Sequence, residues 1–159
     1  MKRRENGFTL IELLIVIAII GILAAIAIPN LLNAVQRGKQ KRTMVDMRTL
    51  ATAIESYNVD NSVFPAAGCT GGYTASGTAL DEASFAALTP TYLASPPRQD
   101  GWGRFLLYSV DNPFGNYNIV SLGRNGSADS LVCGTTTDFN DDILFSNGGF
   151  LQWPEGSQR

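Results

Sequence analysis

The sequence lacks histidine altogether, and it has few charged residues and few cysteines for its length. Among 159 residues none is histidine, 16% are charged and two are cysteine. Without histidine, neither a Ser-His or Cys-His catalytic pair nor a histidine-ligated metal site can form. The net charge of −2, with no basic face beyond the first third of the chain, argues against a dedicated nucleic-acid site.

The shortage of charged residues is greatest in one stretch near the N-terminus. Residues 8–28 contain a single ionisable residue, Glu12, and neither lysine nor arginine. A bilayer core of ~30 Å needs about 20 apolar residues in a helix, and this run supplies them. The run is longer than the apolar region of an ordinary secretory signal, and apolar residues resume beyond Pro29. We therefore predict a retained transmembrane helix in which Glu12 either marks a function or snorkels to the headgroups.

Beyond residue 30 the pattern changes from apolar on all sides to amphipathic. Apolar side chains recur at three- and four-residue spacing, at Met47, Leu50, Ala51, Ile54 and Tyr57. Asp60, Asn61 and Ser62 end the pattern, and Phe64-Pro65 follows. The pattern thus predicts one helix of roughly 50 residues, from residue 8 to about residue 59. Its first half suits an apolar environment, and its second half can pack one face on a domain.

The remaining chain has the pattern of a small α+β domain. Residues 105–110 and 117–122 are rich in aromatic and β-branched residues, which predicts an antiparallel hairpin. A third strand is expected in 143–145 or 150–153, and a short helix around 81–88. The fold class is therefore α+β, with a long N-terminal helix, half transmembrane and half amphipathic, packed on a small antiparallel sheet.

The segment Gly7-Phe8-Thr9-Leu10-Ile11-Glu12, between a short basic leader and the apolar run, resembles the class III signal of type IV pilins and pseudopilins. The resemblance implies that a prepilin peptidase cuts between Gly7 and Phe8 and then N-methylates Phe8. Glu12 becomes the fifth residue of the processed chain, where the family's glutamate pairs with the N-terminal amine of a neighbouring subunit. A buried carboxylate needs such a cation. The resemblance also implies a helix kink at Pro29, which a helix-interior proline favours in any case.

The head region resembles the major pseudopilin, the G subunit, of type II secretion systems. Residues 92–103 are similar to the tyrosine-leucine, proline and Asp-Pro-Trp-Gly signature of that subunit, with Gly101 where the family has proline. The resemblance implies the type IV pilin or pseudopilin fold. Its parts are a cleaved leader (1–7), a transmembrane and assembly segment (8–29), an amphipathic helix (30–60) and an exported head (61–159).

Residues 121–126 and 140–143 resemble the two halves of the G subunit's calcium loop. By position, Leu122 would supply a backbone carbonyl, Asp141 and Asp142 match the family's acidic pair, and Asn125 stands in place of an aspartate. The asparagine keeps an oxygen but loses a charge, so the affinity for Ca²⁺ is expected to fall. The alternative is that these residues serve only as turn formers. Two more acids in this loop, Asp129 and Asp138, are additional candidate ligands.

Cys69 and Cys133 are the two cysteines, and both fall in predicted loops. In an exported domain an even pair indicates one disulfide, here between the connector and the long loop. A metal site built on two thiolates is disfavoured because neither histidine nor a third cysteine is available.

The function implied by the resemblance is structural, not enzymatic. We expect a subunit of a helical filament, the type II secretion pseudopilus, assembled from the bacterial inner membrane to help drive protein export. The alternative within the family is the major type IV pilin of a surface filament. Expected partners are other copies of the chain, the prepilin peptidase, minor pseudopilins or pilins, the inner-membrane assembly platform and, before assembly, the lipid bilayer. Before processing, the N-terminus of this single-pass protein would be cytoplasmic, and the head periplasmic, or extracellular in a surface pilus.

A different class of function is an enzyme anchored by its N-terminal helix. Its carboxylate site would be built from four acids of the long loop, Asp129, Asp138, Asp141 and Asp142. An uncleaved Gly7–Phe8 bond and a monomer in detergent would favour this alternative.

Overall fold

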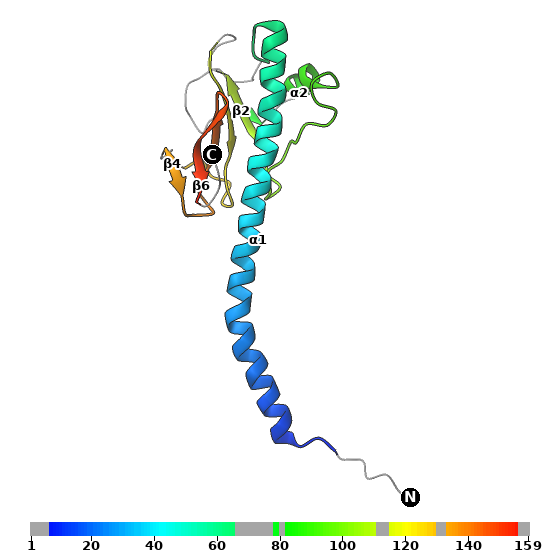
Figure 1. Cartoon of the computed structure of the whole chain (residues 1–159), viewed down its shortest axis with the longest axis vertical. Coiled ribbons are helices and arrows are strands. Elements are labelled where there is room, and N and C mark those ends of the chain that lie inside the picture. The colour runs from blue at the N-terminus through cyan, green and yellow to red at the C-terminus, as the bar shows by residue number, and fades with distance from the viewer. Residues whose placement is uncertain (1–6, 66–77, 80–81, 111–114, 130–132, 156–159) are drawn as a thin grey trace, which may run out of the picture. The chain divides into compact units, whose positions relative to one another are not determined.

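The computed structural model of the chain describes residues 7–65, 78–79, 82–110, 115–129 and 133–155. The chain divides into two compact units, Met1–Gln36 and Arg37–Arg159. The long helix α1, Leu10–Asn61, contributes to both units (Figure 1). Its extent confirms the single N-terminal helix that the sequence predicts.

The N-terminal part of α1 exposes its apolar side chains. Phe8 is 80% exposed, and large apolar residues from Leu10 to Val35 are between 45% and 75% exposed. An 18-residue window of α1 has a mean hydropathy of 3.0, and none of it is buried. By length and composition this helix is a candidate membrane anchor, and none of the described residues covers the apolar side chains of that window.

The C-terminal part of α1 packs one face on the head. The buried side chains of this part include Met47, Leu50, Ala51 and Ile54, which confirms the predicted stripe. Arg48, Thr52 and Glu55 on the opposite face are exposed. The helix is thus amphipathic where it meets the head, as its three- and four-residue periodicity indicates.

A β-sheet faces this part of α1 (Figure 1). It has six strands in the order β1-β2-β3-β5-β6-β4. Its strands are β1 (Thr78–Ala79), β2 (Leu107–Val110), β3 (Tyr117–Ser121), β4 (Gly134–Thr136), β5 (Ile143–Ser146) and β6 (Gly149–Pro154). Neighbouring strands are antiparallel except β4 and β6, which pair in parallel. The predicted hairpin is β2–β3, and both candidate positions for a third strand are strands, β5 and β6. The α+β class is confirmed. The sheet is larger than the three strands expected, and the parallel pairing of β4 with β6 makes it mixed, whereas a wholly antiparallel sheet was expected.

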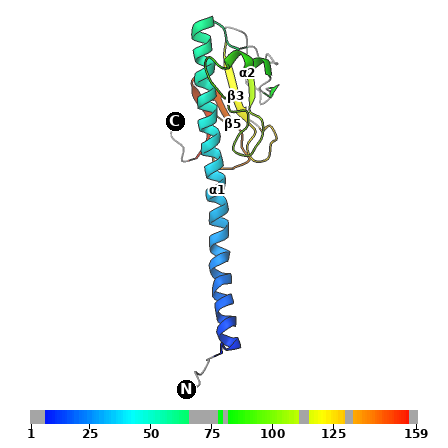
Figure 2. The same cartoon turned by 90° about the vertical axis from the view of Figure 1, so that its right-hand side faces the viewer.

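The core lies between the sheet and α1. It contains Tyr108, Tyr117, Ile119 and Phe145 from the strands, with Leu88 from the short helix α2 (Glu82–Leu88). Figure 2 shows α2 beside the same part of α1, with β3 and β5 behind. Burying these apolar side chains accounts for the stability of the head, at about 25 cal/mol per Å² removed from water.

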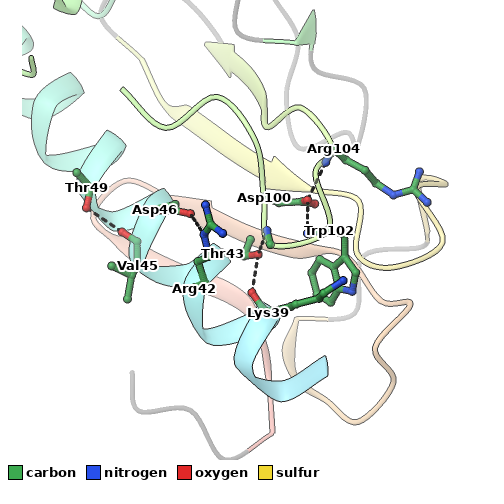
Figure 3. Close-up of polar contacts among 10 residues, drawn as sticks. Lys39, Arg42, Thr43, Val45, Asp46, Thr49, Asp100, Trp102 and Arg104 are labelled. Carbon is green, nitrogen blue, oxygen red and sulfur yellow. Dashed lines mark hydrogen bonds and ion pairs between the residues drawn. The ribbon is translucent and has the colours of Figure 1, made fainter. Parts of the chain in front are cut away.

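A turn before β2 docks directly on α1 (Figure 3). The Gly101 amide donates to Thr43 Oγ1 at 2.8 Å, while the Thr43 hydroxyl donates to the Lys39 carbonyl at 2.9 Å. A Cβ on Gly101 would lie 2.4 Å from that carbonyl oxygen. Glycine is therefore required here, because only a residue without a side chain allows the turn to approach the helix backbone so closely.

Candidate functional site

The predicted processing point lies just ahead of the helix. Gly7, Phe8 and Thr9 are exposed and have no regular secondary structure, and α1 begins at Leu10. A Cβ built on Gly7 would meet nothing within 4 Å. The bond between Gly7 and Phe8 is therefore in an open, non-helical segment, which is the form of backbone that a protease needs.

Glu12 and Thr9 form a reciprocal pair at the start of α1. Glu12 Oε2 accepts hydrogen bonds from the Thr9 amide at 2.9 Å and from the Thr9 hydroxyl at 2.6 Å. The Glu12 amide in turn donates to Thr9 Oγ1 at 3.3 Å. This is a capping box, which satisfies amide groups that the first helical turn leaves unpaired. The arrangement occupies one carboxylate oxygen, and Oε1 has no hydrogen bond to a described residue.

At Pro29 the helix continues without interruption, since residues 10–61 are all helical. A proline at this position removes one backbone hydrogen bond and crowds the preceding turn. Beside the proline, Asn30 Nδ2 donates a hydrogen bond to the Ile26 carbonyl at 3.1 Å. The kink expected at Pro29 stays a prediction.

The second candidate site is the loop between β3 and β5. Its two halves approach each other closely at Gly123, where an added Cβ would lie 2.4 Å from the Asn140 carbonyl oxygen, and the φ of Gly123 is +57°. The Arg124 amide donates to the Phe139 carbonyl at 2.9 Å, and Arg124 Nε to Asn140 Oδ1 at 3.0 Å. The structure therefore brings together the two halves that the sequence motifs match.

Asp142 is the most unusual group of this loop. Asp142 is 0% exposed, and its Oδ1 is buried without a hydrogen bond to a described residue. The other oxygen, Oδ2, accepts from the Asp129 amide at 3.1 Å. Burial raises the pKa of Asp142 to about 6, and the charges of Asp129 and Asp141 add to the rise. Burial and the neighbouring charges of Asp138 and Asp129 also raise the pKa of Asp141. Crowded carboxylates with a buried free oxygen favour a cation.

Asn125 is turned toward its own loop. Its Oδ1 accepts from the Ser127 amide at 3.0 Å, and its Nδ2 donates to Asp129 Oδ2 at 3.0 Å. The Leu122 carbonyl accepts from the Gly126 amide at 3.0 Å, which closes the turn around Asn125. A carbonyl oxygen has a second lone pair, so Leu122 keeps the capacity to bind a cation.

The structure brings only some of the predicted site residues close together. Within the described ranges no three acidic, cysteine or histidine side chains lie close enough together to hold a metal ion as they stand. Cys133 is exposed and forms no disulfide with a described residue. Its proposed partner, Cys69, lies outside the described residues, as does most of the predicted leader, 1–6. The disulfide and the calcium site therefore stay predictions.

Sequence reasoning missed two features of these sites. The capping role of Thr9 has a local signal, because threonine followed three residues later by glutamate marks a helix start. The hydrogen bond from the Asp129 amide to Asp142 has none, since it joins residues 13 apart in an irregular loop.

Comparison with known proteins gives consistent matches over both parts of the chain. Residues 2–28 match the family described as prokaryotic N-terminal methylation motif, and residues 30–141 match type II secretion system (T2SS), protein G. The chain is 34% identical over 148 residues to type II secretion system core protein G of Aeromonas hydrophila, covering 92% of this chain and 94% of that protein. It is 33% identical to the core protein G of Dickeya chrysanthemi, over 90% of this chain and 87% of the relative. Type IV major fimbrial protein FimA of Dichelobacter nodosus is 38% identical over 80% of this chain and 78% of its own length.

Proposed function

The chain belongs to the type II secretion system protein G family, and from this premise we propose that it is the repeating subunit of a secretion pseudopilus whose assembly helps drive protein export. The observation that carries the proposal is the exposed apolar surface of α1, which continues into an amphipathic part covered by the head. In a filament, helices of many copies would cover one another's apolar surfaces and place the heads outside. Burial of that surface is the driving force expected for such assembly.

Processing would come first. A prepilin peptidase would cut after Gly7 and methylate the new N-terminus at Phe8, and the match of residues 2–28 to the methylation motif supports this step. The open segment ahead of Leu10 supports it as well, because no described residue crowds Gly7.

Assembly would then depend on Glu12. Before assembly its Oε2 caps the helix through Thr9, which leaves Oε1 for a second partner. The amine created at Phe8 of a neighbouring copy is a cation of the required sign. In an apolar filament core an unpaired carboxylate is costly, so the pair would form only after cleavage and would favour correct register between copies.

The location and partners follow from the same proposal. The processed chain would wait as a single-pass protein of the inner membrane with the lipid bilayer around the first part of α1. Its N-terminus would face the cytoplasm before cleavage and its head the periplasm. Minor pseudopilins and the assembly platform would be its further partners, and its role would be structural without catalysis.

The test uses a host whose own copy of the gene is deleted. Wild-type chain should restore secretion and yield filaments that shear from the cells. Glu12→Gln should be cleaved and methylated but should not assemble, because the amide oxygen still caps Thr9 while the charge is lost. Thr9→Val, which keeps Glu12, is the matched control for helix capping alone. Normal filaments from Glu12→Gln would refute the pairing, and normal secretion without the chain would refute the function.

A surface type IV pilin is the second candidate function, and the similarity to the fimbrial protein FimA favours it. The same deletion strain separates the two. Loss of surface filaments with intact secretion identifies a surface pilin with roles such as adhesion, motility or DNA uptake. Loss of secretion with surface filaments intact identifies the pseudopilus.

We also propose that the loop between β3 and β5 binds Ca²⁺. Asp141, Asp142 and the Leu122 carbonyl would hold the ion, and Asn125 would offer at most an uncharged amide oxygen. The buried, unpartnered Oδ1 of Asp142 fits this set, because oxygen ligands with negative charge are those that Ca²⁺ prefers. The ion would neutralise the acidic groups and link the two halves of the loop. If EGTA changes neither the melting temperature nor filament assembly, there is no such site.

A disulfide between Cys69 and Cys133 is proposed for the exported head. The exposure of Cys133, just ahead of β4, supports it, because an oxidising compartment can reach that thiol. Intact mass under non-reducing conditions tests it, and two free thiols in the exported protein would rule it out.

A further inference from the structure

Asp142 is a buried acidic residue at the end of the β3–β5 loop, directly before β5. Its side chain is fully buried, its Oδ1 has no hydrogen bond to any residue of the described part of the chain, and its backbone carbonyl accepts from Gln152 Nε2 at 2.9 Å. A buried carboxylate oxygen without a hydrogen bond is unfavourable unless a ligand completes it. The free oxygen therefore points to a cation and is independent of the family resemblance.

Asp129 is the acid that lies against this group. Its amide donates to Asp142 Oδ2 at 3.1 Å, so the loop folds back and places the two residues side by side. The carboxylate of Asp129 is half-buried and sits on a loop, which lets it turn toward a bound ion.

Asn125 is arranged to support Asp129. Its Nδ2, a donor that cannot bind a cation, faces Asp129 Oδ2, and its Oδ1, an uncharged oxygen, already accepts from the Ser127 amide. The amide donates to one oxygen of Asp129, and among the described residues no hydrogen bond reaches the other oxygen. Asparagine at this position is thus suited to hold a neighbouring carboxylate in place.

We propose that Asp129 supplies the third carboxylate of the cation site, beside Asp141 and Asp142, in place of the one that Asn125 lacks, and that Asn125 is the positioning residue. The inference rests on the calcium site proposed above and assigns its ligands in this chain. The site then combines Asp129, Asp141 and Asp142 with the Leu122 carbonyl. The carboxylates need to converge by side-chain rotation, because the described side chains do not yet form such a group.

The test measures Ca²⁺ binding by equilibrium dialysis of the full-length protein in detergent micelles. Asp129→Asn should weaken binding by about tenfold or more, since Ca²⁺ affinity follows the number of charged ligands. Asn125→Ala should weaken it less, about threefold, because the ligand itself remains. Glu155→Gln is the matched control, because Glu155 is an exposed acid outside this loop, and the variant should bind as wild type does.

The melting temperature in EGTA and in excess Ca²⁺ separates ligation from folding. Under the proposal, the melting temperature of Asp129→Asn in EGTA is no lower than that of wild type, because a charge near Asp142 is removed. Excess Ca²⁺ raises the melting temperature of this variant by less than it raises that of wild type. Wild-type binding by Asp129→Asn, or a lower melting temperature in EGTA, would overturn the assignment of Asp129. A larger loss from Asn125→Ala than from Asp129→Asn would return the ligand role to Asn125. Absence of Ca²⁺ binding by wild type would refute the whole site and leave the filament proposal untouched.

Discussion

Replacing Gly101 by alanine tests how closely the head docks on α1. The added Cβ would lie 2.4 Å from the Lys39 carbonyl oxygen, 2.8 Å from its carbon and 2.9 Å from its Cα, all of them backbone atoms. A helix backbone cannot yield as a flexible side chain can, so the turn must move away from α1. That movement breaks the hydrogen bond from the Gly101 amide to Thr43 Oγ1.

The cost is the sum of two effects. Overpacking against rigid atoms costs about 1–3 kcal/mol, and the loss of a hydrogen bond in a buried setting adds about 1 kcal/mol. For a folded unit of about this size the melting temperature should fall by roughly 5–12 °C. Gly101→Pro, the residue of the resembling family signature, should be at least as harmful, because proline also lacks the amide donor.

Thermal unfolding of the full-length protein in detergent, followed by tryptophan fluorescence, measures this change, since Trp102 adjoins the substituted residue. Gly149→Ala is the matched control, because nothing lies within 4 Å of its added Cβ. Thr43→Val isolates the hydrogen bond and should cost about 1–2 kcal/mol. If Gly101→Ala melts within a degree or so of Gly149→Ala, the close approach of turn and helix is refuted.

Two further predictions concern acidic side chains of the head. The buried Asp100 carboxylate accepts hydrogen bonds from the Trp102 and Arg104 amides at 2.8 and 2.9 Å and from Ser121 Oγ at 2.8 Å. Asp100→Ala should therefore lower the free energy of unfolding, measured in urea, by about 2–4 kcal/mol, whereas Ser121→Ala should lower it by about 1 kcal/mol. A cost for Asp100→Ala no larger than that for Ser121→Ala would contradict this role. In EGTA, the raised pKa of Asp142 means that between about pH 4 and pH 6 the folded state keeps a proton that the unfolded state has lost. The free energy of unfolding should therefore fall as the pH rises from about 4 to about 6, and it should stay low above pH 6. Asp142→Asn should reduce that fall, and an identical pH profile for both proteins would exclude Asp142 as its source.

The sequence by itself determined the features that depend on local periodicity. The run of apolar residues, its single acid and the stripe from Met47 to Tyr57 predicted the extent and faces of α1, because a helix repeats every 3.6 residues whatever it packs against. Segments rich in aromatic and β-branched residues predicted β2 and β3, because such side chains fit the pleated, half-buried surface of a sheet. Strands β1 and β4, of two and three residues, are too short to show such a period.

Only the tertiary structure decided the contacts between distant segments. The bond between Gly101 and Thr43 joins residues 58 apart, and the parallel pairing of β4 with β6 depends on the path of the long loop. The hydrogen bonds that connect Asp129 with Asn125 and with Asp142 depend on how that loop folds back on itself. Loops close in many ways at similar entropic cost, so residue types name the candidate ligands, while the folded chain decides which of them meet.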